Sequence, residues 1–239
     1  MVFARKAWWC FAAGLAACAA QGQTQPATTA PAGAATANAA LDAHLKANAA
    51  IKTLQTDFVC RKDLAMLESP LVSRGTVTIA KPQSVRFSTL KPYVSELILN
   101  DGKVLQRSQH ETAWTKSDPS ARPGLNAIMG QLAGWSVGNA GKISEYYAVA
   151  WAEKPLAASP DAGAKQAATS AETFLLAPTN GDLQKVIKQL TLAFDPQTHH
   201  LLAVQFVTQQ GDTTTYWFAA PTIDAALPAD VFAPKAGGG

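Results

Sequence analysis

The pentapeptide GWSVG at residues 134–138 is the first pattern that could carry catalysis, because it places Ser136 in a G-x-S-x-G motif. In hydrolases with this motif, the serine lies between a strand and a helix, where its hydroxyl acts as a nucleophile. Here a helical pattern precedes Ser136, and a run of small residues follows it. The regular alternation of strands and helices that this hydrolase fold requires is also missing from the sequence. We therefore retain a Ser136 hydrolase only as a minor hypothesis.

The four histidines are the next residues that could do chemistry, as metal ligands. His199 and His200 are adjacent, so in a strand they would point to opposite faces and could not easily bind one ion. The preceding DPQT makes both of them turn residues. We place His44 on the exposed side of a helix and His110 after a hairpin. Because these histidines lack partners at metal-ligand spacing, we expect no metal site, no cofactor and no catalysis.

The cysteines exclude two further kinds of site. Cys10 and Cys18 lie in or next to an N-terminal apolar run, which leaves Cys60 alone in the body of the chain. A single cysteine cannot form an internal disulfide or a cysteine-based metal site. We expect Cys60 to be a buried, small apolar residue.

The N-terminus has the features of an export signal. Arg5 and Lys6 precede eleven uncharged, mostly apolar residues at 7–17, a run too short to span a bilayer but typical of a signal peptide. Two cleavage interpretations stay open. Leu15–Cys18 resembles a bacterial lipobox, in which Cys18 would carry acyl chains. Alternatively, the small residues at 16–20 form an ordinary cleavage site, and Cys18 is lost.

Composition divides the rest of the chain into two parts. Residues 18–40 hold no charge and almost no bulky side chain, which predicts a flexible tether after a signal peptide at 1–17. Residues 41–235 are long enough for one domain with a sizeable core. Removing Arg5 and Lys6 lowers the formal net charge from +3 to +1. That balance does not indicate a nucleic-acid-binding protein.

The hydrophobic periodicity predicts a mostly β domain. Apolar residues recur at helical spacing over 39–54 and over 123–135, which predicts two helices. Elsewhere the period is two, and the DG at 101–102 is typical of a hairpin turn. The segment 153–172 lacks bulk, so we expect an exposed insertion. About ten strands are expected, beginning near residue 56 and continuing over 74–80, 84–89, 95–100, 103–108, 111–117, 143–152, 173–178, 186–194, 201–210 and 213–220. Short turns between them require antiparallel pairing.

The order of these elements resembles a known family. The stretches that carry the resemblance are IKTLQTDFVCRK, RGTVTIAKPQSVRFS, ILNDGKVL, LTLAFDPQTHHLLAVQF and LPADVFAPK, and the resemblance covers about 41–234. In order and spacing they resemble the periplasmic outer-membrane lipoprotein carriers of the LolA type. The resemblance implies a mainly β (α+β) fold: an unclosed, strongly curved antiparallel sheet, or incomplete β-barrel, with helices covering its concave apolar face.

The resemblance also implies a function. A carrier of this type is a periplasmic chaperone that binds the acyl chains of lipoproteins in an apolar cavity and ferries them toward the outer membrane. Its expected partners are acylated lipoproteins, an inner-membrane releasing complex and an outer-membrane receptor, and we expect a monomer. Each acyl CH₂ gains about 0.8 kcal/mol on burial, so such a carrier needs an apolar interior and a movable lid. It does not need catalytic residues.

The residues expected to line the cavity lie on one face of the alternating strands and on the two helices. They are Val77, Ile79, Val85, Phe87, Leu97, Leu99, Leu190, Leu192, Phe194, Val204, Phe206, Leu45, Ile128, Met129 and Leu132. The same residues could equally form an ordinary core between helices and sheet. The family often has an arginine before the proline of KPQSVRF, where it is thought to hold the lid shut. Here that position is Lys81, which keeps the charge but not the planar fork of donors.

Two alternatives to a soluble carrier share the implied fold. A membrane-tethered acceptor (LolB-like) is favoured by Leu15–Cys18 and the tether, but we expect no protruding loop with an exposed bulky apolar residue. A lipid-sensing regulator of envelope stress is the other alternative. Such regulators usually carry a second domain, for which this chain has no room.

Overall fold

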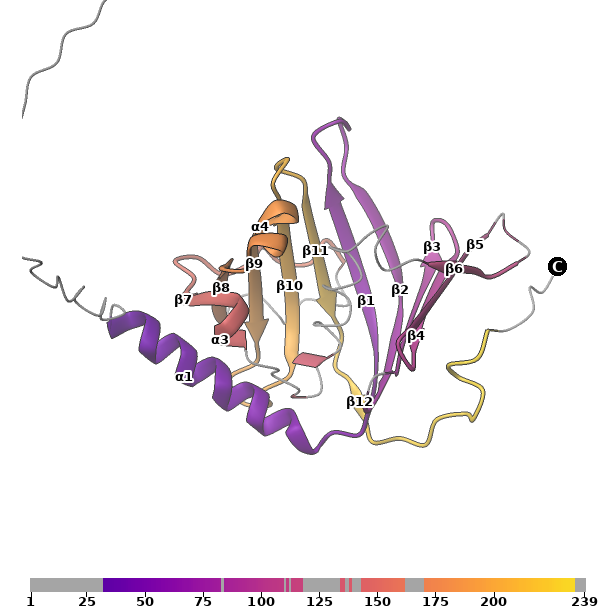
Figure 1. Ribbon diagram of the computed structural model, residues 1–239, viewed down its shortest axis with the longest axis horizontal. Helices are drawn as coiled ribbons and strands as arrows, with labels where there is room; N and C mark the ends of the chain where they lie inside the picture. Colours follow the sequence, from indigo (N-terminus) through magenta and orange to yellow (C-terminus); the bar gives the residue numbers. More distant parts are fainter. Residues whose placement is uncertain are drawn as a thin grey trace, which may run out of the picture. The chain divides into compact units, whose positions relative to one another are not determined.

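Most of the described chain forms one antiparallel sheet. The computed structural model describes residues 32–82, 84–109, 111, 113–117, 134–135, 138, 143–161 and 170–234 (Figure 1). Within them, twelve strands share one sheet. They are β1 (Thr53–Asp63), β2 (Leu71–Ala80), β3 (Ser84–Lys91), β4 (Ser95–Asn100), β5 (Lys103–Ser108), β6 (Thr115–Ser117), β7 (Tyr147–Trp151), β8 (Glu172–Pro178), β9 (Ile187–Phe194), β10 (Leu201–Thr208), β11 (Thr213–Phe218) and β12 (Thr222–Ile223).

The strand order shows that the sheet is not closed into a barrel. It runs β6-β5-β4-β3-β2-β1-β11-β10-β9-β8-β7, and β12 pairs separately with β1. β6 and β7 are therefore the two edges of the described sheet. The sheet has two halves, one made of β1–β6 and the other of β7–β11. The pairing of β1 with β11, in the register Phe58 to Phe218, joins them. This confirms the mainly β, antiparallel and unclosed sheet that the resemblance implied.

Local sequence explains the tight turns of the sheet. Asp101 and Gly102 connect β4 and β5 with φ values of 48° and 72°, the left-handed geometry that a two-residue hairpin requires. Gly211 has a φ of 90° between β10 and β11, which glycine adopts without steric cost. The DG signal in the sequence therefore predicted the first of these connections correctly.

The helices are α1 (Ala32–Ala47), a 3₁₀ turn η1 (Asn48–Ala50), α3 (Ile143–Tyr146) and α4 (Gly181–Val186). The sequence predicted one helix over 39–54, which is wrong at both ends. α1 begins inside the segment expected to be a tether, because alanine has the highest helix propensity and gives no hydrophobic periodicity. It ends early because Ile51 is already extended, with φ −62° and ψ 125°. The predicted helix over 123–135 lies almost wholly outside the described residues.

Two other predicted segments differ from the structure. The strand expected over 143–152 begins with α3, and β7 follows it. The segment between the strands expected at 173–178 and 186–194 forms α4, where the Asn180 side chain accepts a hydrogen bond from the Leu183 backbone N–H at 3.4 Å. Short helical turns of this kind give no periodicity that a sequence pattern could show.

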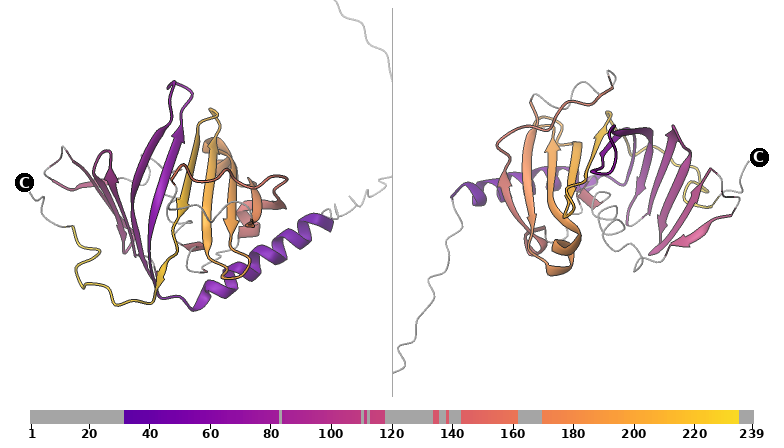
Figure 2. Two further views of the ribbon diagram at one scale, coloured as in Figure 1. Left: turned by 180° about the vertical axis from the view of Figure 1, so that it is seen from behind. Right: turned by 90° about the horizontal axis from the view of Figure 1, so that it is seen from above.

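The sheet has two faces with different coverings. On the inner face, side chains from most strands join α1 in one apolar cluster, in which Ala37, Leu41 and Leu45 represent the helix. On the outer face, a second and smaller cluster consists of Val59, Leu156, Ala193, Ala203 and Trp217. The two views of Figure 2 show the sheet from behind and from above. Inner face and outer face are used in this sense below.

The segment at 152–161, here called the strap, lies against the outer face (Figure 2, left). Leu156 is buried in the outer cluster, and the Trp217 indole Nε1 donates to the Ala157 carbonyl at 2.9 Å. Arg74 pairs with Asp161 at 2.6 Å. The prediction of an exposed insertion over 153–172 agrees with most of the residues at 153–161, which are exposed, and Leu156 is the buried exception. A single leucine and a backbone carbonyl make these contacts, and neither stands out in a sequence rich in small residues.

Candidate functional site

The predicted cavity residues in the described chain all lie in one place. The strand residues with inward side chains join Leu45 of α1 in or against the inner cluster. This set is Val77, Ile79, Val85, Phe87, Leu97, Leu99, Leu190, Leu192, Phe194, Val204 and Phe206. Ile128, Met129 and Leu132 lie outside the described residues, as do Cys18 and Ser136. The period-two alternation thus assigned the strand residues to a common face, while a role in binding acyl chains stays a prediction.

Aromatic residues that the predicted set omitted complete the inner face. Phe58 and Tyr216 lie 5.5 Å apart between ring centroids, and Phe87 contacts both of them. Tyr216 also stacks near Phe218 at 6.4 Å. The stretch TTTYWF alternates Tyr216 and Phe218 with Trp217, and this alternation was the signal that could have identified them.

The ionisable groups at the centre of this face are neutral. Cys60 is buried beside Tyr216, and burial raises the pKa of its thiol, with smaller opposing effects of Lys62, Tyr216 and Ser73. Burial likewise raises the pKa of Tyr216 well above its usual value. The expectation that Cys60 is a buried apolar residue agrees with this environment. The inner face is therefore suited to apolar ligands and not to ionic ones.

The inner face contains a small cavity. It has a volume of about 20 Å³ and lies among Leu54, Thr56, Val77, Ile79, Phe87, His200, Leu201, Phe218, Ala219 and Pro221. That volume holds about one water molecule. This cavity is therefore too small to hold an acyl chain.

α1 packs on the inner face, where Trp135 and, from α3, Ile143 also join the inner cluster. Leu41 and Leu45 are each 1 % exposed and pack into the inner cluster. His44, which we predicted to be exposed, is 2 % exposed and stacks on Phe194 with ring centroids 4.8 Å apart. The expectation was wrong because helical periodicity gave the inward positions to leucines only.

His44 belongs to a polar cluster at the end of α1. Its Nε2 lies 2.7 Å from Oε2 of Glu172, and its Nδ1 lies 3.0 Å from Nδ1 of His199. The buried Asn48 donates to the carbonyl oxygens of His44 and His199 at 3.2 and 2.7 Å. His199 and His200 follow a turn, as predicted, and the described residues contain no group of His, Cys, Asp or Glu arranged to hold a metal ion.

The comparison with protein families decides the relationship. The profile described as "Outer membrane lipoprotein carrier protein LolA" matches residues 49–235, which is most of the chain. The chain belongs to the LolA family. No curated protein sequence matches it significantly. Members of this family are carrier or binding proteins of the bacterial envelope, so the family relationship gives no support to an enzyme.

Several solved structures are similar to the chain at low sequence identity. A LolA-superfamily protein from Nitrosomonas europaea is 9 % identical, with a TM-score of 0.42, over 83 % of this chain and 97 % of that one. The Mycobacterium tuberculosis lipoprotein LppX is 10 % identical, with a TM-score of 0.46, over 81 % and 100 %. In the Pseudomonas aeruginosa MucA/MucB complex the values are 16 % and 0.44, over 84 % of this chain and 62 % of that one.

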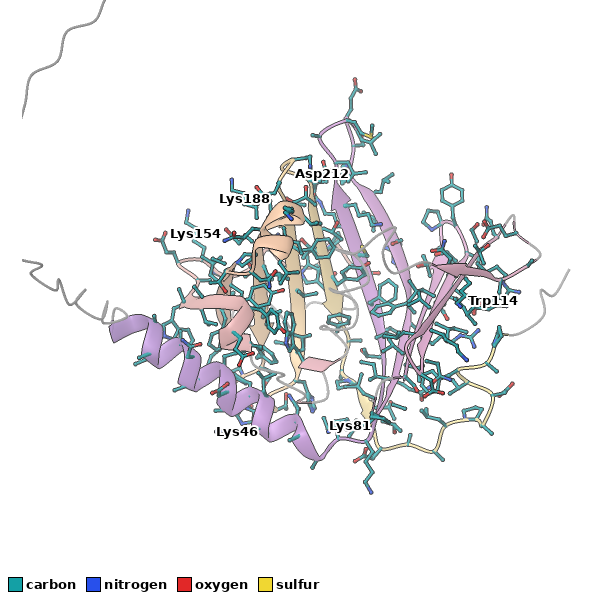
Figure 3. The ribbon with its side chains drawn as sticks, viewed as in Figure 1. Lys46, Lys81, Trp114, Lys154, Lys188 and Asp212 are labelled. Atoms are coloured by element: carbon teal, nitrogen blue, oxygen red, sulfur yellow. The ribbon has the colours of Figure 1, made fainter. Side chains whose placement is uncertain are left out.

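In this LolA-family chain, Lys81 directly contacts η1, the 3₁₀ turn that follows α1. Its Nζ donates to the carbonyl oxygen of Ala49 in η1 at 2.5 Å. Figure 3 labels Lys81 near the lower end of β2 and Lys46 on α1. Lys81 thus joins the β2–β3 turn to the segment that follows α1, although a latch function stays a prediction.

Exposed apolar side chains gather at one end of the same LolA-family sheet. The loop between β1 and β2 projects beyond the neighbouring strands (Figure 1) and exposes 85 % of Met66 and 43 % of Leu67. The β3–β4 loop exposes Tyr93 and Val94. Both loops lie at the same end, because the start of β2 pairs with the end of β3. The expectation that no loop carries an exposed bulky apolar residue is therefore wrong.

The outer face holds two polar features. A pocket of about 380 Å³ lies where the strap meets β1–β3, lined by Asp57, Phe58, Val59, Arg74, Gly75, Leu90, Lys91, Asp161, Trp217 and Ala219. Nearer the β6 edge, Glu96 pairs with Arg86 and also with Arg107, the latter at 2.7 Å. The Arg107 guanidinium lies 4.8 Å from the centroid of the Trp114 ring.

Among the described residues, no helix combines the length and the apolar character needed to cross a bilayer.

Proposed function

We propose that this chain is a periplasmic carrier that binds the acyl chains of lipoproteins on its inner face and ferries them toward the outer membrane. The observation that supports this most is the single apolar cluster that combines α1 with both halves of the open sheet. The LolA family match over 49–235 supports the same function. In this proposal, the inner-face residues serve both as the core of the empty protein and as the wall of the loaded one.

Energetics explain why such a face suits the task. Burial of acyl chain gains about 0.8 kcal/mol per CH₂, so extraction of a multiply acylated protein from a bilayer costs tens of kcal/mol unless another apolar surface replaces the lipid. The neutral state of Cys60 and Tyr216 avoids the cost of placing charge beside acyl chains. Because this gain has no preferred direction, release requires only that the cargo meet a second apolar environment.

The proposal includes partners and location. We place the carrier in the periplasm as a monomer that receives acylated lipoproteins from an inner-membrane complex and delivers them to an outer-membrane receptor. It also includes residues 1–17 as a signal peptide, 18–31 as a connecting segment and a carrier domain that begins with α1 at Ala32 and ends at 235. No catalytic step, metal or cofactor is needed.

The test measures binding of a fatty acid that carries an environment-sensitive fluorophore. The exported protein is titrated with the probe, and a triacylated lipopeptide is then added as competitor. Leu97 and Leu99 are half-buried at the inner cluster on β4, so L97W and L99W fill space there. If each excludes about two CH₂ groups, affinity should fall about tenfold.

The matched control changes a leucine on the other face of the neighbouring strand. Leu105 of β5 pairs with Ile98, whose side chain points away from those of Leu97 and Leu99. L105W should keep the affinity of the unchanged protein, with folding of all three variants checked by circular dichroism. Absence of saturable binding, or equal losses in L97W, L99W and L105W, would overturn the proposal.

A membrane-tethered acceptor is the second candidate, and the β1–β2 loop favours it. Met66 and Leu67 on this loop, together with Tyr93 and Val94 nearby, are apolar and exposed at one end of the sheet. Such a rim suits contact with lipid or with an apolar protein surface. The lipobox-like sequence before Cys18 would supply the anchor.

Mass spectrometry of the mature N-terminus separates the two candidates. The carrier proposal expects a soluble protein that begins after Cys18 and has no lipid. A diacyl or triacyl mass on Cys18, found in the membrane fraction, would reject the soluble carrier and support the tethered acceptor. A C18A variant controls for membrane association through the exposed loop alone.

A further inference from the structure

His44 is an ionisable side chain buried under the helix that covers the inner face. It lies one turn before the end of α1, is 2 % exposed and stacks on Phe194. Its Nε2 lies 2.7 Å from the Glu172 carboxylate, whose side chain is 42 % exposed. A carboxylate only accepts hydrogen bonds, so Nε2 carries a hydrogen and donates it.

The other ring nitrogen of His44 faces a second histidine. Nδ1 of His44 and Nδ1 of His199 lie 3.0 Å apart, so one nitrogen donates and the other accepts. When both rings are neutral, His199 donates to His44. When the pair holds one added proton, His44 is the cation beside Glu172 and donates to His199. Both states keep one hydrogen between the rings.

This arrangement of the two rings cannot accept a second added proton without repulsion between them. Each ring would then present an N–H and a positive charge to the other across 3.0 Å. Asn48 of η1 donates to the backbone carbonyl of His199, which holds the His199 backbone beside the end of α1. His199 is also held in the left-handed region with a φ of 61°. The repulsion therefore acts between α1 with η1 and the β9–β10 turn.

The charged groups around the pair lie on three elements. Glu172 begins β8, and Asp42 and Lys46 lie on the exposed side of α1. In the β9–β10 turn, Asp195 accepts hydrogen bonds from the backbone of Thr198 and Gln197, chiefly Thr198, and these lower its pKa. Burial, with a smaller contribution from His199, lowers the pKa of His200, although Asp195 opposes it. Glu172 is the carboxylate that directly contacts either ring of the pair in the described chain.

We propose that His44 and His199 form a proton-sensitive clasp, which keeps α1 on the sheet while it holds at most one added proton and releases α1 when it takes up a second. Release would uncover Leu41, Leu45 and the inner cluster beneath them. The idea that the clasp admits acyl chains rests on the proposed function. The effect of protons on the docking of α1 does not.

The direction of the pH effect follows from proton counting. With α1 docked the pair binds at most one added proton, and with α1 released it binds two. The released state is therefore favoured as pH falls through the range in which the second proton binds, by up to tenfold per pH unit. Above that range both states have neutral rings, and the docked state should be insensitive to pH.

The experiment is amide hydrogen exchange of residues 37–45 at pH 7.5 and pH 5.0, corrected for intrinsic exchange and made on the exported protein without cargo. Protection of α1 should fall at least about tenfold between the two conditions. In H199N it should stay constant, because asparagine tolerates a positive φ and its amide can present a donor or an acceptor to His44. H200N changes the adjacent histidine and should respond as the unchanged protein does.

Two results would overturn the clasp: constant protection in the unchanged protein, or an equal loss of protection in H199N. Nitrogen-15 NMR of the imidazole rings supplies a test that needs no variant. Below pH 6, the Nδ1 signals of His44 and His199 should change together with α1 protection, and independent changes would also reject the clasp. Because no cargo is present, failure here leaves the acyl-binding test unaffected, and the reverse also holds.

Discussion

At the scale of single residues, Glu96 is a charge whose removal has a defined consequence. Its side chain is 13 % exposed and lies between Arg86 and Arg107. Burial opposes ionisation, but the hydrogen bonds from both guanidinium groups outweigh it and lower the pKa of Glu96. Arg86 also donates to the Val231 carbonyl at 2.9 Å. Glu96 therefore stabilises both the β3–β5 region and the C-terminal segment.

E96Q should lower the free energy of unfolding by about 2 kcal/mol at pH 7, because two arginines lose their buried counter-charge. The pKa of this carboxyl group is lower in the folded protein than in the unfolded chain, so the ionised group stabilises the fold at pH values above the unfolded pKa. This contribution is lost as pH falls through the pKa of the folded protein. The difference between E96Q and the unchanged protein should thus shrink below about pH 4. Urea unfolding at pH 7 and pH 3.5 measures it.

Glu68, an exposed carboxylate on the β1–β2 loop, supplies the comparison. E68Q should unfold at the same urea concentration as the unchanged protein at both pH values. If E96Q and E68Q behave alike, Glu96 is effectively solvated and the network with Arg86 and Arg107 adds nothing to stability.

The sequence could not reveal the role of single polar residues such as His44. Helical spacing assigned the inward positions of α1 to leucines, and His44 one position before Leu45 looked exposed. Its partners Glu172 and His199 lie 128 and 155 positions away in the chain. Only the fold brings them together, so a polar cluster of this kind leaves no local signal.

At the scale of elements, the period-two alternation of apolar residues predicted strands more reliably than helical spacing predicted helices. The inward residues of β9 and β10, such as Leu192 and Val204, were assigned to one face correctly because the period-two pattern was strict. The Asp101–Gly102 turn was predicted from its residue types, which adopt the left-handed backbone geometry that the structure shows. The same reasoning missed α1 before residue 39 and the packing of the strap, because alanine-rich segments have no bulky residues to mark a face. Burial of Leu156 depends instead on Trp217 from a distant strand.

At the scale of the molecule, the end of α1 is held from both halves of the sheet. The β9–β10 turn contacts it through His199 and Asn48. The β2–β3 turn contacts it through Lys81 and Ala49. The inner-face cavity of about 20 Å³ is too small for an acyl chain, so we expect α1 to move when one enters. Movement of its end would break both contacts.

We therefore expect K81M to accelerate uptake of the fluorescent fatty acid by up to about tenfold, since a charge-assisted hydrogen bond is worth about 1.5 kcal/mol. K81R should restore slow uptake, because a guanidinium can donate to the same Ala49 carbonyl oxygen. Stopped-flow fluorescence gives the rates, and K46M removes a lysine from the exposed side of α1 as the matched control. Equal rates in K81M and K46M would mean that Lys81 is only a turn residue, and that His44 and His199 hold the end of α1 without it.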